Sequence, residues 1–164
     1  MEHTTLLSLD SSTKSTGWAL WKDGFFCESG VIDLSDVKDM DQRSSQMMIQ
    51  ILTLLTDKEP DLVVVERMHV TRNMKVVRAL CEVIGAIRGW CLCVDSFFYE
   101  LGPTEWRKAI GMKTGREIKR DEYKQLSKEY VAEKFNVKDV TDDESDAICI
   151  GNAYINIFTG IQGE

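Results

Sequence analysis

An apolar segment that ends on a carboxylate constrains this sequence more than any other feature. Leu6 to Leu9 is typical of a short buried strand, Asp10 follows it, and a run of hydroxyl residues leads through Gly17 into a second apolar run that ends at Leu20. This order predicts a strand, a tight turn and a second strand. A carboxylate at the end of a buried strand is costly unless a cation or several donors offset the cost. Asp10 is therefore the first candidate functional residue.

Strands and helices are predicted in alternation along the rest of the chain. Apolar residues three and four apart favour helices, whereas β-branched runs between turn residues favour strands. We expect strands over residues 25–34, 62–65 and 94–101, and helices over residues 41–57, 73–91, 103–109, 119–135 and from residue 142 onward. Thr141 and Glu144 have the spacing of a capping box at the start of the last helix. The 164 residues suit one domain, spanning residues 1–164, with a substantial core.

Three more carboxylates stand at notable positions. Glu66 ends the β-branched run that begins at Leu62, and Asp143 and Asp146 are three residues apart, so they share one face of the last helix. Carboxylates gathered at one place repel one another unless cations lie among them. Oxygen ligands favour a hard ion such as Mg²⁺ or Mn²⁺. Two such ions about 4 Å apart activate a water and stabilise the leaving oxygen in phosphodiester hydrolysis.

Each of these acids, taken alone, also has a plainer explanation. Asp143 or Asp146 alone fits a negative charge at a helix N-terminus, where it interacts favourably with the helix dipole. Asp10 alone fits a residue that caps a turn. Glu66 is the most informative of the four, because a buried β-branched run seldom ends on an acid.

The charge distribution leaves nucleic-acid binding open. The net charge of −7 argues against it at first sight. Residues 67–88, however, carry five Lys or Arg against one acid, a net +4, and residues 107–128 carry eight against three, a net +5. The remainder carries −16, so the chain would have a directional field. Solvated helix faces would explain the same two segments equally well.

The cysteines and the apolar segments limit which metal sites and which cellular compartments are expected. The five cysteines lack the paired spacing of a zinc site and are expected to be free thiols. No apolar run is long enough to cross a bilayer and no basic-then-apolar leader begins the sequence, so we expect a cytoplasmic protein with no membrane contact.

The segment over residues 73–91 predicts a helix that is apolar on two sides. One row comprises Val76, Leu80, Val83, Ile87 and Trp90, and the other comprises Met74, Val77, Cys81, Ile84 and Cys91. A helix of this kind buries both sides. One row would cover the sheet and the second would face a partner, with Gly85 and Gly89 permitting close approach; a central core helix in a monomer is the alternative.

The order of these motifs resembles the RuvC-type Holliday-junction resolvases. The likeness lies in a strand that ends at Asp10 with Thr16-Gly17 after it, in the segment from Glu59 to Glu66, and in Asp143 to Ala147 before an apolar helix. Residues 103–107, Pro-Thr-Glu-Trp-Arg, are similar to the phage and poxvirus members. The resemblance covers nearly the whole chain. It implies an α/β, ribonuclease H-like fold, with a central mixed five-stranded sheet and helices on both faces.

The resemblance also implies an activity and its residues. A resolvase of this type is a structure-selective endodeoxyribonuclease that cuts four-way DNA junctions in pairs by two-metal hydrolysis, leaving 5′-phosphate and 3′-hydroxyl ends. It works as a homodimer, here through the 73–91 helix. By position the metal ligands are Asp10, Glu66, Asp143 and Asp146, with two Mg²⁺ per active site, Mn²⁺ substituting. Bacterial members usually place a DNA-stacking aromatic residue a few positions after the glutamate, where this chain has His69 nearest.

Basic residues near these acids are candidates for DNA contact. They are His69, Arg72, Lys75, Arg78, Lys113, Arg116, Lys119, Arg120 and Lys124. His69 could instead be an ordinary loop histidine. Because the net charge is negative, we expect non-specific DNA affinity to be modest and strongly dependent on salt.

Four other functions fit part of the pattern. An actin-like ATPase would explain Asp10 to Gly17, but it needs a second phosphate loop and a nucleotide pocket for which the chain has no room, so no nucleotide cofactor is expected. A nuclease for forks and flaps, or for RNA–DNA hybrids, would use a similar metal site. A junction-binding protein without catalysis would be expected to lack one of the four acids, and none is missing.

Overall fold

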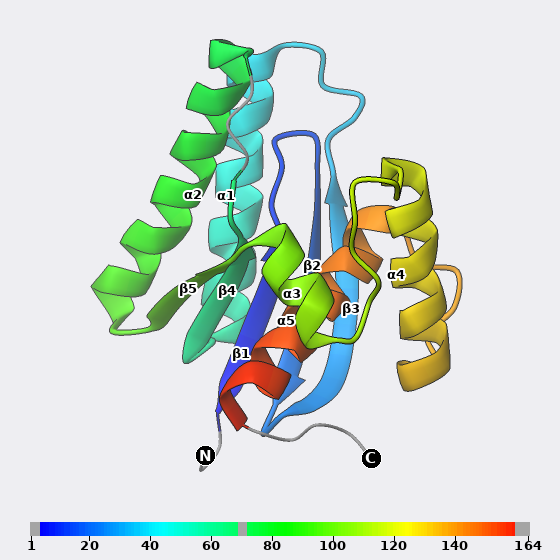
Figure 1. Ribbon diagram of the computed structural model, residues 1–164. Coiled ribbons are helices and arrows are strands. Elements are labelled where there is room, and N and C mark those ends of the chain that lie inside the picture. Colours follow the sequence, from blue (N-terminus) through cyan, green and yellow to red (C-terminus); the bar gives the residue numbers. More distant parts are fainter. Residues whose placement is uncertain (1–3, 69–71, 160–164) are drawn as a thin grey trace.

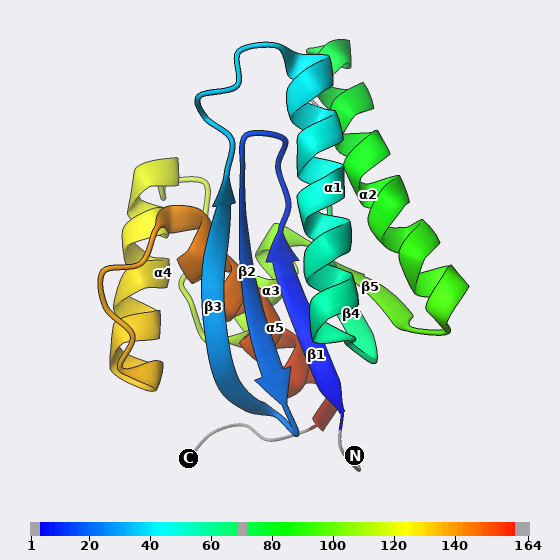
Figure 2. The ribbon, with the colours of Figure 1, turned by 180° about the vertical axis from the view of Figure 1, so that it is seen from behind.

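The computed structural model describes residues 4–68 and 72–159. His69, a predicted DNA contact, lies outside these residues. The elements in chain order are β1 (Thr5–Asp10), β2 (Ser15–Lys22), β3 (Phe25–Asp33), α1 (Met40–Lys58), β4 (Leu62–Glu66), α2 (Met74–Val94), β5 (Phe97–Leu101), α3 (Pro103–Ala109), α4 (Arg120–Phe135) and α5 (Asp142–Thr159). Figure 1 shows α3, α4 and α5 on one face of the sheet, and Figure 2 shows α1 and α2 on the other. The predicted α/β class is confirmed.

The sheet is mixed and has the strand order β3-β2-β1-β4-β5. The first three strands pair antiparallel, and a turn at Asp23-Gly24 joins β2 to β3 with positive φ angles of 54° and 83°. Glycine at the second position suits this turn because it adopts a positive φ without steric cost. β4 and β5 run parallel to β1. Consequently β1 and β4 lie side by side and end at the same edge of the sheet.

Two hydrophobic cores lie on either side of the sheet, and the strands supply both by alternation. Leu6 and Val64 pack in the core beneath α3, α4 and α5, whereas Leu7 and Val65 pack in the core beneath α1 and α2. This period of two follows from the pleat of a strand. It fixes which side chains at the ends of β1 and β4 face α5.

The helix α5 packs so close to the sheet that two contact positions have room only for glycine. Gly17 of β2 packs against the backbone of Asp143, and Gly151 of α5 packs against the Trp21 indole; a Cβ atom at either glycine would collide with these neighbours. The buried Ser8 hydroxyl donates to the Ala147 carbonyl over 2.8 Å. These contacts fix both the height and the register of α5 over β1 and β2.

Two predicted details of the helices differ from the structure. α2 continues to Val94, so β5 begins only at Phe97. At the start of α5, Thr141 Oγ1 accepts the Glu144 N–H over 3.2 Å as predicted, but Glu144 Oε1 accepts a hydrogen bond from the Ser29 hydroxyl over 2.7 Å. The Glu144 carboxylate therefore links α5 to β3.

The predicted apolar rows of α2 are only partly correct. Val83 and Ile87 of the first row are buried as expected. In the second row, predicted to face a partner, Cys91 is buried in the core and Ile84 packs against that core. Met74 and Cys81 of this second row do lie on the outward face, which also carries Leu92. The error for Ile84 and Cys91 arises because a helix with two apolar rows does not reveal from its sequence which row meets the sheet.

Candidate active site

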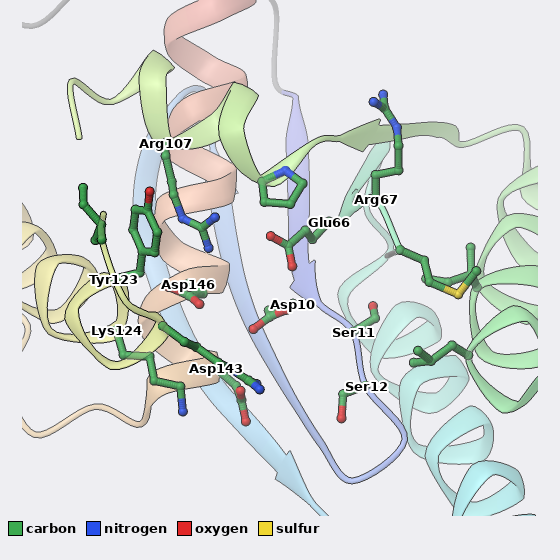
Figure 3. A pocket seen from close by; sticks show the side chains of 16 residues that line it. Asp10, Ser11, Ser12, Glu66, Arg67, Arg107, Tyr123, Lys124, Asp143 and Asp146 are labelled. Atoms are coloured by element: carbon green, nitrogen blue, oxygen red, sulfur yellow. The ribbon is translucent and has the colours of Figure 1, made fainter. Parts of the chain in front are cut away.

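Strand alternation brings Asp10 and Glu66 together. Leu9 of β1 pairs with Val65 of β4 in parallel register, so the next residue on each strand is a carboxylate. Both follow residues that face the opposite core, and both therefore point to the α5 side of the sheet. Figure 3 shows the two side chains directed into one cavity.

The helix α5 brings Asp143 and Asp146 to the same cavity. Gly17 lies opposite Asp10 in the β1–β2 ladder and packs against the Asp143 backbone, so the first turn of α5 begins at the level of Asp10. Residues three apart share a helix face. The predicted metal ligands Asp10, Glu66, Asp143 and Asp146 all line the same cavity of about 610 Å³.

The electrostatics of this cluster are unfavourable without a cation. Burial, followed by the negative charges of Glu66, Asp146 and Asp143, raises the pKa of Asp10 well above its ordinary value. Burial also raises the pKa of Asp146 to about 6. The Arg107 guanidinium opposes both shifts. A cavity that disfavours ionised carboxylates to this extent would gain stability from a bound cation.

The donor set fits a hard divalent ion. The carboxylates offer oxygen ligands only, and Asp146 Oδ1 is buried with no hydrogen-bond partner among the described residues. Within residues 4–68 and 72–159, however, no three Asp, Glu, His or Cys side chains are gathered closely enough to form a ready-made metal shell. The four carboxylates share the cavity, and ligation would require their side chains to converge on an ion.

Two arginines at the site were not predicted from the sequence. Arg107 of α3 lies between two aromatic rings, with its guanidinium carbon 4.5 Å from the Trp106 ring centre and 4.4 Å from that of Tyr123. Arg67 lines the cavity directly after Glu66, and its Nη2 donates to the Glu100 carbonyl over 3.2 Å. The signal available in the sequence was that Arg107 follows a tryptophan in a predicted helix directly after a predicted strand.

The eight predicted DNA-binding residues that the structure describes fall into three groups. Arg120 and Lys124 line the cavity, and Lys124 also pairs with Asp142 over 2.6 Å. Lys113, Arg116 and Lys119 are exposed on the connection that leads into α4. Arg72, Lys75 and Arg78 are exposed at the start of α2, where Arg78 pairs with Glu82. Figure 1 shows the starts of α2 and α4 at the same end of the molecule, one on each side of the sheet.

Two of the hydroxyl residues after Asp10, Ser12 and Thr16, stabilise the turn itself. Ser12 Oγ accepts the N–H groups of Lys14 and Ser15 over 3.0 and 3.2 Å, and Thr16 Oγ1 donates to the Ser12 carbonyl over 2.9 Å. An actin-like phosphate loop would direct such groups at a nucleotide. The local bonds give these hydroxyls a structural role instead.

No family model and no curated protein matches the sequence. The structure, in contrast, resembles several solved resolvases. RuvC of T. thermophilus, solved in complex with a Holliday junction substrate, superposes with a TM-score of 0.73 at 15% identity over 96% of this chain and 97% of that one. The yeast mitochondrial Holliday junction resolvase Ydc2 gives 0.61 at 13% identity, covering 93% and 78%.

A viral structure extends the likeness. The Fowlpox virus resolvase, solved with Holliday junction DNA, gives a TM-score of 0.56 at 17% identity over 96% of this chain and 87% of that one. In the described part of the chain, no helix is both long and apolar enough to cross a membrane. The strand order, the helices on both faces and these superpositions show that the chain has the ribonuclease H-like fold of the RuvC-type resolvases.

Proposed function

We propose that this protein is a divalent-metal-dependent endonuclease that resolves four-way DNA junctions. The observation that carries the proposal is the meeting of Asp10, Glu66, Asp143 and Asp146 at one cavity, on a fold matched along almost its whole length by RuvC. Two of these acids end neighbouring parallel strands and two share the first turns of α5. Their convergence depends on both the sheet register and the seating of α5.

The four carboxylates would hold Mg²⁺, or Mn²⁺ in its place, with two ions per active site. When bound, such ions supply an activated water and charge stabilisation for an in-line displacement at phosphorus. The chain's own contribution is to hold the carboxylates on rigid elements and to supply a cation, Arg107, at the same cavity. A guanidinium held between two rings loses little conformational freedom when it meets a phosphate oxygen. The expected products carry 5′-phosphate and 3′-hydroxyl ends.

Basic side chains around the cavity support DNA as the substrate. Arg67, Arg107, Arg120 and Lys124 line it, and the exposed basic residues at the starts of α2 and α4 extend the positive surface on both sides. Phosphate contacts of this kind supply affinity without sequence information. We therefore expect selectivity to come from the shape of a branched substrate, in keeping with a role in DNA recombination or repair.

We further propose a homodimer formed through α2. On its outward face, Met74 is 70% exposed to solvent and Leu92 is 78% exposed. Exposure of large apolar residues on one surface is typical of an interaction site. Gly85 and Gly89 lie on this helix, and a Cβ atom at either would meet no described atom within 4 Å. A twofold axis at this face would place two active sites at a fixed separation, as paired incision of a symmetric junction requires.

A panel of substrates tests the proposal. End-labelled four-way, forked, flap and RNA–DNA hybrid substrates would be incubated with the protein, with and without Mg²⁺. We expect Mg²⁺-dependent paired incisions in the four-way junction at the lowest protein concentration. Preferential cleavage of forks, flaps or hybrids would favour another nuclease, and metal-dependent binding without incision would favour a junction-binding protein. Asp36→Asn, at an exposed residue before α1, is the control for loss of a carboxylate.

A further inference from the structure

Trp106 joins the hydrophobic core to the candidate metal site. Its indole N–H donates to Glu66 Oε1 over 2.9 Å, while the residue itself is completely buried beneath α5. An indole has one polar hydrogen, so Trp106 directs its single donor at a carboxylate of the cavity. Hydrogen bonds to an ionised acceptor are about twice as strong as neutral ones.

The backbone that carries Trp106 is fixed on both sides. Glu66 pairs with Leu101 at the end of β5, and α3 begins two residues later. The strand pairing therefore fixes where α3, and with it Trp106, lies relative to Glu66. At the other end of α3, Asn156 Nδ2 of α5 donates to the Ala109 carbonyl over 3.1 Å. The indole is therefore a donor with a fixed position and direction.

A fixed donor determines how a carboxylate presents its oxygens. Glu66 Oε1 accepts the indole N–H, whereas Glu66 Oε2 does not take part in this hydrogen bond. Partners that orient metal ligands in this way typically change metal affinity or activity by 10- to 100-fold when they are removed. We propose that Trp106 is a positioning residue that holds the Glu66 carboxylate in the orientation needed to bind a divalent cation. This inference rests on the proposed function and assigns Trp106 no contact with DNA or with the ion.

The first test removes only the donor. Trp106→Phe keeps an aromatic ring and deletes the indole N–H. We expect Mn²⁺ affinity, measured by calorimetry without DNA, to fall about 10-fold or more, and cleavage at saturating junction to slow to a similar extent, with junction affinity measured in Ca²⁺ unchanged. Raising the Mn²⁺ concentration should restore part of the rate, which a general loss of structure would not allow.

Trp90→Phe is the matched control. Trp90 donates its indole N–H to Thr56 Oγ1 over 3.3 Å between α1 and α2, away from the carboxylates. This variant loses the same chemical group and should bind Mn²⁺ and cleave as the unmodified protein does. Urea unfolding of both variants reports how much stability each substitution costs.

A second measurement uses the unmodified protein, so it does not depend on a variant folding. Each of the four tryptophans gives one indole N–H resonance in a ¹⁵N correlation spectrum. We expect the Trp106 resonance to shift on addition of Mg²⁺ and in Glu66→Gln, while that of Trp90 stays in place. The inference would be overturned if the Trp106 resonance shifted neither on addition of Mg²⁺ nor in Glu66→Gln, or if Trp106→Phe left the Mn²⁺ affinity unaltered. Failure of the unmodified protein to cut any branched DNA while the Trp106 resonance still responds would instead reject the proposed function.

Discussion

Gly17 of β2 lies directly against the backbone carbonyl of Asp143, with no room between them for a methyl group. The same glycine is the ladder partner of Asp10. One small residue thus sets the distance between the strand that carries the first candidate ligand and the helix that carries two others.

Gly17→Ala should therefore damage both stability and the site. The added methyl collides with a backbone atom, which cannot rotate away, so α5 must shift. We expect a loss of about 1–3 kcal/mol in the free energy of unfolding, the usual range for overpacking, and a larger fractional loss of Mg²⁺-dependent cleavage. Urea denaturation and single-turnover cleavage measure the two effects. Unchanged stability together with full activity would show that α5 does not depend on this contact.

The raised pKa values of the carboxylates predict a pH dependence of stability without metal. The pKa of Asp146 is about 6 in the folded protein against an ordinary 3.8, so its ionisation opposes folding above pH 6. This cost disappears as the pH falls from about 6 towards 4, because the folded state then binds the additional proton. With a chelator present, we expect the thermal midpoint to rise between pH 8 and pH 5, and to rise less in Asp146→Asn. An equal rise in both proteins would contradict the assigned cause.

Basic residues at the start of α4 should contribute to DNA affinity through counterion release. Lys119→Ala with Arg120→Ala removes two cations beside the cavity. We expect weaker junction binding and a slope of log affinity against log salt that is shallower by about 1 to 2. Lys134→Ala with Lys138→Ala, near the other end of α4, is the matched control and should leave the slope unchanged. Identical slopes in all three proteins would mean that Lys119 and Arg120 form an ordinary solvated surface.

A charge on the outward face of α2 tests the proposed dimer. Leu92→Lys alters an exposed residue, so it should not disturb folding. We expect a folded monomer that nicks one strand of a four-way junction but fails to make paired incisions. Ile49→Lys, on an exposed part of α1, is the matched control and should remain dimeric. Sedimentation of the unmodified protein as a monomer at micromolar concentration would reject the dimer.

The sequence supported prediction of the strands and of the candidate ligands because both depend on short-range patterns. Asp10 and Glu66 stood out because each ends an apolar strand, and helical spacing placed Asp143 and Asp146 on one face. These patterns are local and strong. The superposition on RuvC over nearly the whole chain agrees with that prediction of the fold.

The parts that could not be predicted depend on contacts between distant segments. Arg107 becomes a site residue only because α3 and α4 place Trp106 and Tyr123 on either side of it. The outward face of α2 was assigned correctly for Met74 and Cys81 but wrongly for Ile84 and Cys91, because these two fit a surface row and a buried row equally well until the helix meets the sheet. The donation from Trp106 to Glu66 likewise joins residues 40 positions apart.

Cleavage by single-carboxylate variants tests the central claim most directly. Asp10→Asn, Glu66→Gln, Asp143→Asn and Asp146→Asn would each be assayed on a labelled four-way junction in Mg²⁺, with junction binding measured in parallel in Ca²⁺. If these side chains hold catalytic metal, the unmodified protein should make paired incisions only when Mg²⁺ is present, and each variant should lose cleavage while retaining binding. Full activity in any variant would remove that residue from the site, and incision by the unmodified protein in the presence of a chelator would contradict the metal-dependent account as a whole.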